Sequence, residues 1–186
     1  MIYLKWSLLA LIDILLLVTL PVAAPLISLF TKEGPYGLPE YTWGWIWGTF
    51  DNPPQGDQGW VTKRCIFPGI TTGVKGYINR VGWMFRNPLY GYARKAAVPF
   101  TEGTVVIYKG NPDISDKYKI SGSYFAKAVD KDDKVVAFEY YLVKPIGSSN
   151  DLRVRLGWKI MSSKFNSRGF APIVNNINPF DGYGNE

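Results

Sequence analysis

The longest uninterrupted apolar segment lies at the start of the chain. From Ser7 to Phe30 the sequence reads SLLALIDILLLVTLPVAAPLISLF, and Asp13 is its only charge. A helix of this length would measure about 36 Å, enough to cross a hydrocarbon core of about 30 Å. Pro21 and Pro25 each remove a backbone donor and are expected to kink or end the helix, so that the clean apolar stretch stops before Pro21.

Three interpretations of this segment stay open: a kinked membrane anchor or re-entrant hairpin, a helix buried against other protein copies, and a helix packed on its own domain. Asp13 in lipid would cost roughly 2.5–3.5 kcal/mol, which the surrounding leucines offset. The residues expected to anchor the chain in a membrane or on a partner are Leu8, Leu11, Ile12, Leu15 and Leu16. Asp13 and Pro25 both argue against a cleaved signal peptide, so we expect the segment to be retained and the protein not to be secreted.

Residues 32–62 are rich in Gly, Pro and Trp, which is typical of a loop-rich linker. Four aromatic residues alternate with smaller ones inside it, and an extended backbone would place all four rings on one face. They are Tyr41, Trp43, Trp45 and Trp47. This face either covers a core or serves as an interface for lipid or a protein partner.

The next segment is basic and predicts one amphipathic helix. Val74, Ile78, Val81 and Phe85 follow helical spacing, and Asn87-Pro88 should end the helix. No acidic residue occurs between Lys63 and Lys95. The residues expected to contact an anionic partner are Lys75, Arg80, Arg86, Arg94 and Lys95. A solvated helix face, an anionic membrane surface and nucleic-acid phosphates remain alternatives for this patch.

The C-terminal half has the alternation of β-strands. The predicted strands cover 105–108, 118–129, 135–146 and 152–160, with polar turns at 130–134 and 147–151. In the last strand, Arg153 and Arg155 are expected to face away from the core. Residues 162–186 are polar and predict an arm rather than a folded element.

The predicted fold class is α+β: an N-terminal apolar helix, one amphipathic helix and a C-terminal antiparallel β-meander of about four strands. The predicted organisation has four parts. They are an apolar helix or anchor at 1–31, a Gly/Pro/Trp-rich linker at 32–62, a compact α+β domain at 63–161 and a polar C-terminal arm at 162–186.

Composition argues against catalysis. The 186-residue chain carries a net charge of +6, has no His and has one cysteine, Cys65. These counts exclude His-dependent catalytic sites, imidazole metal sites and internal disulfides. Glu139 is the best placed candidate acid, but we expect it to face solvent from a half-exposed sheet. The sequence therefore predicts no enzyme, no cofactor and no metal, and identifies no small-molecule substrate.

Short motifs spread over the chain give it a resemblance to a family. They are Leu38-Pro39, Trp47, Phe50-Asp51-Asn52-Pro53, Arg86-Asn87-Pro88-Leu89-Tyr90-Gly91, Gly157-Trp158-Lys159 and Asn178-Pro179-Phe180. Together with the apolar N-terminus, they resemble a family of small, uncharacterised tailed-bacteriophage proteins. The resemblance implies a phage origin and supplies no activity.

We therefore expect a non-catalytic phage protein that acts by assembly or docking, as a virion-associated structural component. The alternative is a membrane-anchored accessory protein at the host inner membrane, with its main domain in the cytoplasm, acting in exclusion, lysis or takeover. A basic nucleic-acid-binding protein is a further alternative. The expected partners are correspondingly other phage proteins or copies of the chain, a lipid bilayer, or nucleic-acid phosphates.

Overall fold

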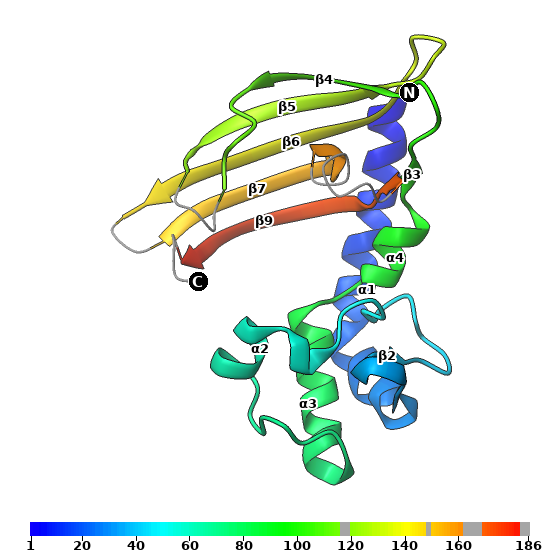
Figure 1. The fold of residues 1–186 in the computed structure, drawn as a ribbon, viewed down its shortest axis with the longest axis vertical. Helices are drawn as coiled ribbons and strands as arrows, with labels where there is room; N and C mark the ends of the chain where they lie inside the picture. Colours follow the sequence, from blue (N-terminus) through cyan, green and yellow to red (C-terminus); the bar gives the residue numbers. More distant parts are fainter. Residues whose placement is uncertain (116–119, 148–149, 162–168, 183–186) are drawn as a thin grey trace. The chain divides into compact units, whose positions relative to one another are not determined.

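A computed structural model describes residues 1–115, 120–147, 150–161 and 169–182. It has a long N-terminal helix, three shorter helices and a five-stranded antiparallel sheet in the C-terminal half, which confirms the predicted α+β class (Figure 1). The residues form two compact units. One comprises residues 11–92, here called the helical unit, and the other comprises residues 1–10 and 93–186, here called the sheet unit.

The helices account for most of the helical unit. Their bounds are α1 (Ile2–Phe30), α2 (Gln58–Lys63), α3 (Gly73–Arg86) and α4 (Tyr90–Lys95), with 3-10 turns η1 (Pro35–Gly37) and η2 (Pro54–Gly56). The end predicted for α3 is confirmed, because Asn87 is its C-cap. The predicted bounds of the apolar helix, 1–31, agree with α1. Neither Pro21 nor Pro25 ends it, because the helix continues through both to Phe30.

Side chains from the rest of the helical unit stabilise the proline-containing part of α1. Trp47 Nε1 donates to the Leu16 carbonyl at 3.2 Å, and Tyr77 Oη donates to the Pro25 carbonyl at 3.4 Å. Arg80 Nε donates to the Ser28 carbonyl at 3.2 Å. Pro21 and Pro25 leave the carbonyls of Leu17 and Pro21 without a helix donor. The three external donors bind other carbonyls of this segment, so they fix α1 to the rest of the unit rather than replace the missing partners.

The core of the helical unit joins α1 to α3. Its members are Leu20, Ala24, Ile27 and Met84, with Ala23, Tyr41 and Trp47 packed against them. The predicted stripe of α3 is not its buried face, since Val74 and Phe85 are 76% and 47% exposed. Its buried residues are instead Gly76, Asn79, Trp83 and Met84. The larger Trp83 and Met84 side chains, which bury more area, decide which face turns inward.

The expectation that Tyr41, Trp43, Trp45 and Trp47 share one face is wrong. Residues 41–48 form bends and turns rather than a strand. Tyr41 and Trp47 pack against the core, whereas Trp43 and Trp45 are 44% and 43% exposed. Gly44 has a φ of +67°, which breaks the extended backbone on which the expectation depended.

The predicted meander is confirmed and gains one strand. The five-stranded sheet has the order β4-β5-β6-β7-β9, all antiparallel (Figure 1). The strands are β4 (Val105–Gly110), β5 (Gly122–Val129), β6 (Val135–Ile146), β7 (Asn150–Trp158) and β9 (Ile173–Gly182). Two small antiparallel pairs join β1 (Lys32–Glu33) to β2 (Pro39–Glu40) and β3 (Val98–Pro99) to β8 (Phe170–Ala171). Residues 118–119 and 148–149 of the predicted strand and turn lie outside the described residues.

The prediction of a polar arm over 162–186 is wrong for residues 170–182. Strand β9 pairs with β7 along its length, although its sequence is rich in Asn and contains Pro179. The register shifts between Asp151 and Arg153, opposite Pro179, where a residue without an N–H does not have to donate to the ladder. Residues 162–168 and 183–186 lie outside the described residues.

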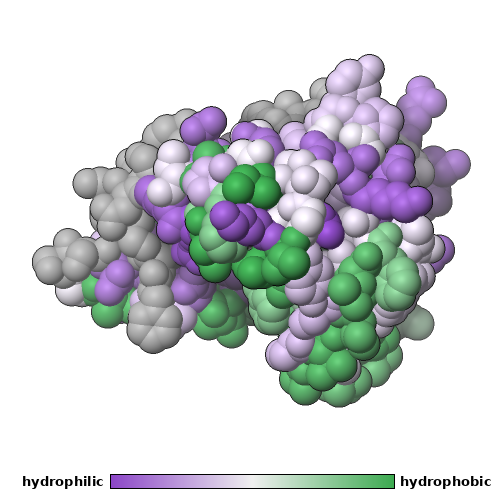
Figure 2. Space-filling view, turned by 90° about the horizontal axis from the view of Figure 1, so that it is seen from below, coloured by the Kyte–Doolittle hydropathy of each residue, from purple (hydrophilic) through white to green (hydrophobic). Residues whose placement is uncertain are grey.

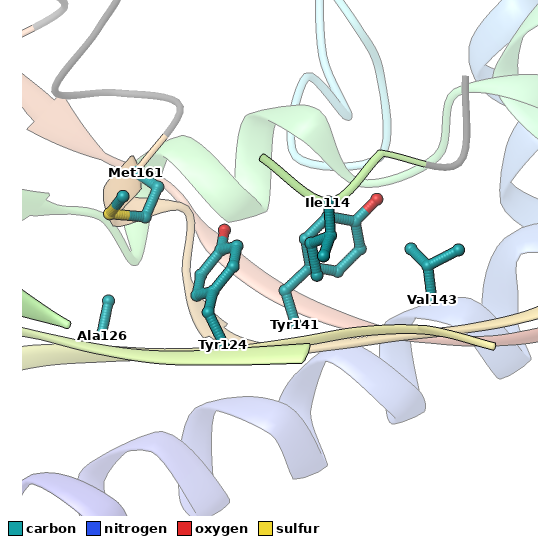
Figure 3. Packing of buried hydrophobic residues seen from close by; sticks show 6 residues of the cluster. All are labelled: Ile114, Tyr124, Ala126, Tyr141, Val143 and Met161. Carbon is teal, nitrogen blue, oxygen red and sulfur yellow. The ribbon is translucent and has the colours of Figure 1, made fainter. Parts of the chain in front are cut away.

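Side chains cover the sheet on both faces. Figure 3 shows one of them, where Tyr124 and Tyr141 rise from the strands beside Met161 and Ile114. Tyr124 and Tyr141 make an edge-to-face contact with ring centroids 5.6 Å apart. On the other face, Phe138 contacts the rings of Trp158, at 5.7 Å, and of Trp6, at 5.6 Å. The middle of β6 is therefore buried on both sides.

This double covering overturns two expectations. Glu139 does not face solvent but is fully buried, and Arg155 does not face away from the core. Arg155 Nε donates to Glu139 Oε1 at 2.7 Å, and the guanidinium lies 4.9 Å from the centroid of the Tyr141 ring. The alternation in β7 correctly places Arg153 and Arg155 on the same face of the sheet. That face is not open to solvent, because other side chains cover it.

The division of the chain differs from the four predicted parts. Residues 32–62, predicted as a linker, belong to the helical unit, and the boundary at 92/93 falls inside the predicted 63–161 domain. Residues 1–10 of the first helix group with the sheet unit and its remainder with the helical unit. The core contacts of Leu20, Ala24 and Ile27 explain why α1 groups with the elements that follow it.

Candidate functional site: the exposed face of the N-terminal helix

The outward face of α1 is a continuous stripe of exposed aliphatic side chains. In the helical unit it consists of Leu11, Leu15, Val18, Val22, Leu26 and Leu29, which are between 48% and 72% exposed. Leu4 and Leu8 continue the same three- and four-residue spacing toward the N-terminus. We call these eight residues the aliphatic stripe. Figure 2 shows strongly apolar surface gathered at its lower right.

The stripe has the length of a bilayer core. With a rise of 1.5 Å per residue, Leu4 to Leu29 spans about 37 Å, against a hydrocarbon thickness of about 30 Å. Only 17% of the most apolar 18-residue stretch of α1 is buried, and α1 is the one described helix that is long and apolar enough to cross a membrane. A core helix of the same composition would be mostly buried.

Asp13 lies on the opposite side of α1 from the stripe. It is two positions after Leu11, which is a rotation of about 200° around the helix. Asp13 is half-buried, and its carboxylate adds to the effect of burial in raising the pKa of Tyr92 to about 12. The cost of exposing Asp13 to lipid, which the sequence left as an objection, therefore does not apply to this face.

Aromatic and basic residues flank the stripe. Tyr3, near its start, is 49% exposed, and Phe30, at its end, lies 6.1 Å from the exposed Trp43 ring. Lys5 and Lys32 are both exposed and stand just outside the apolar stretch. An aliphatic centre between aromatic and basic ends is typical of helices in contact with a bilayer.

The predicted anchor residues mostly belong to this face. Leu8, Leu11, Ile12 and Leu15 are 44–58% exposed, whereas Leu16 is half-buried. The sequence reasoning did not name Val18, Val22, Leu26 and Leu29, because it counted the clean apolar stretch only as far as Pro21. The signal that could have found them is the unbroken i, i+3, i+4 spacing across both prolines.

The predicted basic residues divide between the units and have different roles. In the helical unit, Arg80 donates Nη1 to the Thr71 carbonyl at 2.8 Å, Lys75 lies over the Phe67 ring, and Arg86 lines a cavity. In the sheet unit, Arg94 lies over the Phe170 ring and Lys95 is exposed. Arg80 is a structural residue, since burial lowers its pKa and its donors are bound by backbone oxygens.

Both oxygens of the buried Glu139 carboxylate accept hydrogen bonds from other residues of the sheet unit. Its Oε1 accepts from Arg155, and its Oε2 accepts from the Met161 N–H at 2.8 Å. Burial alone would lower the pKa of Arg155, but the Glu139 carboxylate and Tyr124 outweigh it, so that the pKa is raised. Among the described residues, no group of three or more His, Cys, Asp or Glu side chains could hold a metal ion.

Comparison with known proteins gives a family and no activity. Residues 1–185 match DUF7338, a family of unknown function. No curated protein and no solved structure matches the chain. The match extends from the apolar helix through the last described strand, so both compact units are part of what the family shares. The chain therefore belongs to the DUF7338 family.

Proposed function

We propose that this protein is a non-catalytic docking protein that associates with a lipid bilayer through the aliphatic stripe of α1. The resemblance noted in the sequence extends the proposal to an accessory protein of a tailed bacteriophage at the host inner membrane. The observation that carries the proposal is the exposure of eight aliphatic side chains along one side of a helix whose only acidic residue, Asp13, lies on the other side.

The physical argument is the cost of leaving this surface in water. Each aliphatic residue favours insertion by about 0.3–0.6 kcal/mol near the centre of a bilayer. The stripe contains eight such residues and no charge, and its ends carry aromatic and basic side chains. Large exposed apolar surfaces of this kind mark membrane or protein interaction sites. The aromatic and lysine flanks favour lipid over a protein partner.

A single substitution within the stripe tests the proposal. Leu15→Asp should shift membrane partitioning of the full chain by about 3–4 kcal/mol, or more than a hundredfold, because Asp costs roughly 2.5–3.5 kcal/mol at the centre of a span and the leucine contribution is lost. Carbonate-resistant pelleting of membranes from cells that express the chain measures the effect. Ile107→Asp is the matched control, because Ile107 is an equally exposed aliphatic residue, at 60%, in β4 of the sheet unit.

Two outcomes would contradict the proposal. One is a wild-type protein that stays in the cytosolic fraction, and the other is equal pelleting of the Leu15→Asp and Ile107→Asp variants. Mass spectrometry of the membrane fraction should find residues 2–30 retained, since removal of α1 as an export signal would also exclude the proposed role.

The spacing of the stripe favours one second candidate. Aliphatic residues that recur every three or four positions also form the contact surface between two packed helices. A virion-associated structural component that buries α1 against copies of itself would use the same residues. Purified virions would then contain the chain, and chemical cross-linking at introduced stripe cysteines would join copies in the virion rather than in the membrane fraction.

A further inference from the structure

A second site lies on the helical unit, on the far side of α3 from its contacts with α1. A cavity of about 370 Å³ opens there between α2 and α3. Trp60, Arg64, Ile66, Ile78, Phe85 and Arg86 are among its lining residues. Its volume is at the lower end of the range of ligand pockets, and it would hold a headgroup-sized ligand.

Arg86 is the unusual residue of this cavity. It is half-buried, its Nε is fully buried, and no hydrogen bond or ion pair joins its guanidinium to another residue that the structure describes. Asp57, at the start of α2, accepts with Oδ1 from the Trp60 backbone N–H at 2.9 Å. A buried Nε–H without a partner is costly for a fold, unless a ligand supplies the acceptor.

The other unsatisfied groups nearby have the same character. Trp60 is 4% exposed, and its Nε1 has no hydrogen-bond partner among the described residues. Trp83 Nε1 and Asn87 Nδ2 also lack one, although neither residue lines this cavity. Trp60 and Trp83 are in edge-to-face contact, with ring centroids 5.7 Å apart, and Arg86 is one turn further along α3. Every buried, unpartnered side-chain atom in the described part of this unit is thus a donor.

Apolar side chains surround the basic part of the cavity. Ile66 and Phe85 are 69% and 47% exposed, and Ile78 is half-buried. Arg64, which also lines the cavity, is exposed and brings a second guanidinium to the opening. The cavity therefore combines hydrogen-bond donors and two guanidinium groups with apolar side chains around them.

From this arrangement we propose that the cavity binds the phosphate group of an amphipathic phosphate ester. A phosphate offers enough oxygens for two guanidinium groups, which bind it through paired hydrogen bonds, whereas one Arg suffices for a carboxylate. The exposed Ile66 and Phe85 side chains would contact the ester's apolar chain. That the phosphate comes from a lipid headgroup rests on the proposed membrane function, while phosphate recognition itself does not.

The experiment uses the full chain in lauryl maltoside micelles with ¹⁵N-labelled tryptophan. Seven indole N–H signals are expected, and the Trp60→Phe variant assigns the one at the cavity. Dodecyl phosphate should shift the Trp60 signal saturably, and Arg86→Gln should weaken the apparent affinity about tenfold or more. Lys131→Gln, which removes one positive charge from an exposed turn of the sheet unit, is the control and should change it less than twofold.

Glycerol phosphate distinguishes the sources of the ligand. Binding of dodecyl phosphate at least tenfold tighter than glycerol phosphate supports a lipid headgroup, and equal binding supports a free phosphate ester. No saturable shift, or the same affinity for the Arg86→Gln variant and the wild type, would overturn the proposal.

Two further measurements separate this proposal from a structural role and from the membrane proposal. Arg86→Met should fold with an unchanged or higher Tm, because it removes an unsatisfied buried donor, and a Tm lowered by more than 5 °C would show that Arg86 is structural. Arg86→Gln should pellet with membranes as the wild type does, whereas Leu15→Asp should bind dodecyl phosphate normally. The two proposals can therefore fail independently.

Discussion

Glu139 shows how a charged residue becomes part of the core of the sheet. Both of its oxygens accept hydrogen bonds, one from Arg155 and one from the Met161 N–H, and its side chain is fully buried. The carboxylate thereby joins β6, β7 and the segment after β7. Removing one partner of such a pair leaves the other charge buried and uncompensated.

We expect Glu139→Gln to lower the free energy of unfolding by about 3–5 kcal/mol, because Arg155 would lose its counter-charge inside the sheet unit. Urea unfolding followed by near-ultraviolet circular dichroism measures the change. Glu102→Gln, at an exposed position, is the control and should stay within about 0.5 kcal/mol of the wild type. A loss below about 1 kcal/mol for Glu139→Gln would contradict the role of the ion pair.

Tyr41 connects stability to pH. Burial raises its pKa to about 12, and its hydrogen bonds with the Thr49 backbone hold the hydroxyl group in place. An unfolded tyrosine has a pKa of about 10, so the fold favours the neutral phenol. This stabilisation is fully present below pH 10 and is lost as the pH rises toward 12.

The wild type should therefore lose roughly 2–3 kcal/mol of stability between pH 10 and pH 12 from Tyr41 alone. Tyr41→Phe should show a shallower loss over the same range, although it is less stable at pH 7 because Thr49 loses a partner. Tyr36→Phe is the control, since Tyr36 is 93% exposed, and it should reproduce the wild-type profile. Identical slopes for all three proteins would exclude the effect.

At the scale of elements, both sides of the second half of α1 are mainly apolar, and they differ in what covers them. Ile27 is 1% exposed and contacts the core shared with α3, whereas the adjacent Leu26 is 48% exposed. Substitutions at Ile27 and Leu26, which are nearly equal in size, can therefore distinguish the role of α1 in folding from its role in docking.

Ile27→Ala should reduce the stability of the helical unit by about 2–5 kcal/mol, because it leaves a cavity between α1 and α3. Leu26→Ala should change stability by about 0.5 kcal/mol or less. Thermal unfolding in micelles of the two variants, compared with the wild type, measures this difference. Equal effects would mean that both sides of α1 are equally covered in the folded protein.

Elements with a regular pattern were predictable from the sequence. The amphipathic spacing and Asn87 located the end of α3, and the polar segment at 130–134 located the β5–β6 hairpin, where Asp130 N–H donates to the Lys134 carbonyl. Strand β9 was not predictable, because its Asn residues and Pro179 lack strand propensity and its place depends on pairing with β7. Tertiary contacts also determine that α1 stays helical through Pro21.

The candidate sites were predictable only in part. Leu8, Leu11 and Leu15 were predicted as anchor residues and are exposed on α1, but the sequence left open whether lipid, a partner or the chain's own domain covers them. Arg86 was recognised as a basic residue, yet its missing partner and the cavity beside it depend on the fold of α2 against α3. Sequence patterns can identify the residues of a surface, whereas the shape of that surface depends on how the elements pack.

At the scale of the whole molecule, α1 takes part in both compact units. Its first residues contribute Tyr3 and Trp6 to the aromatic cluster around Phe138, and its second half contributes to the core with Met84. An anchor attached to a domain that folds on its own could be removed without loss of the fold. Here its removal would expose the core side chains of both units to water.

Deletion of residues 1–30 should therefore yield an unfolded or aggregated protein rather than a soluble domain. The loss of Leu20, Ala24 and Ile27 alone removes most of the core of the helical unit. Expression of the truncated chain, followed by limited proteolysis and size-exclusion chromatography, measures this outcome. A protease-resistant monomer would show that the two units fold without α1.

The two margins of the sheet are unequal, and this has a consequence for self-association. Strand β9 carries Pro179 and a shift in register, which obstruct the addition of another strand. No described strand pairs with the outer side of β4, whose Val105, Ile107 and Tyr108 are 48–60% exposed. Another strand can therefore be added only at the β4 edge of the sheet. Two chains that pair β4 with β4 would each use their one available edge, so they would form a closed dimer instead of a fibril.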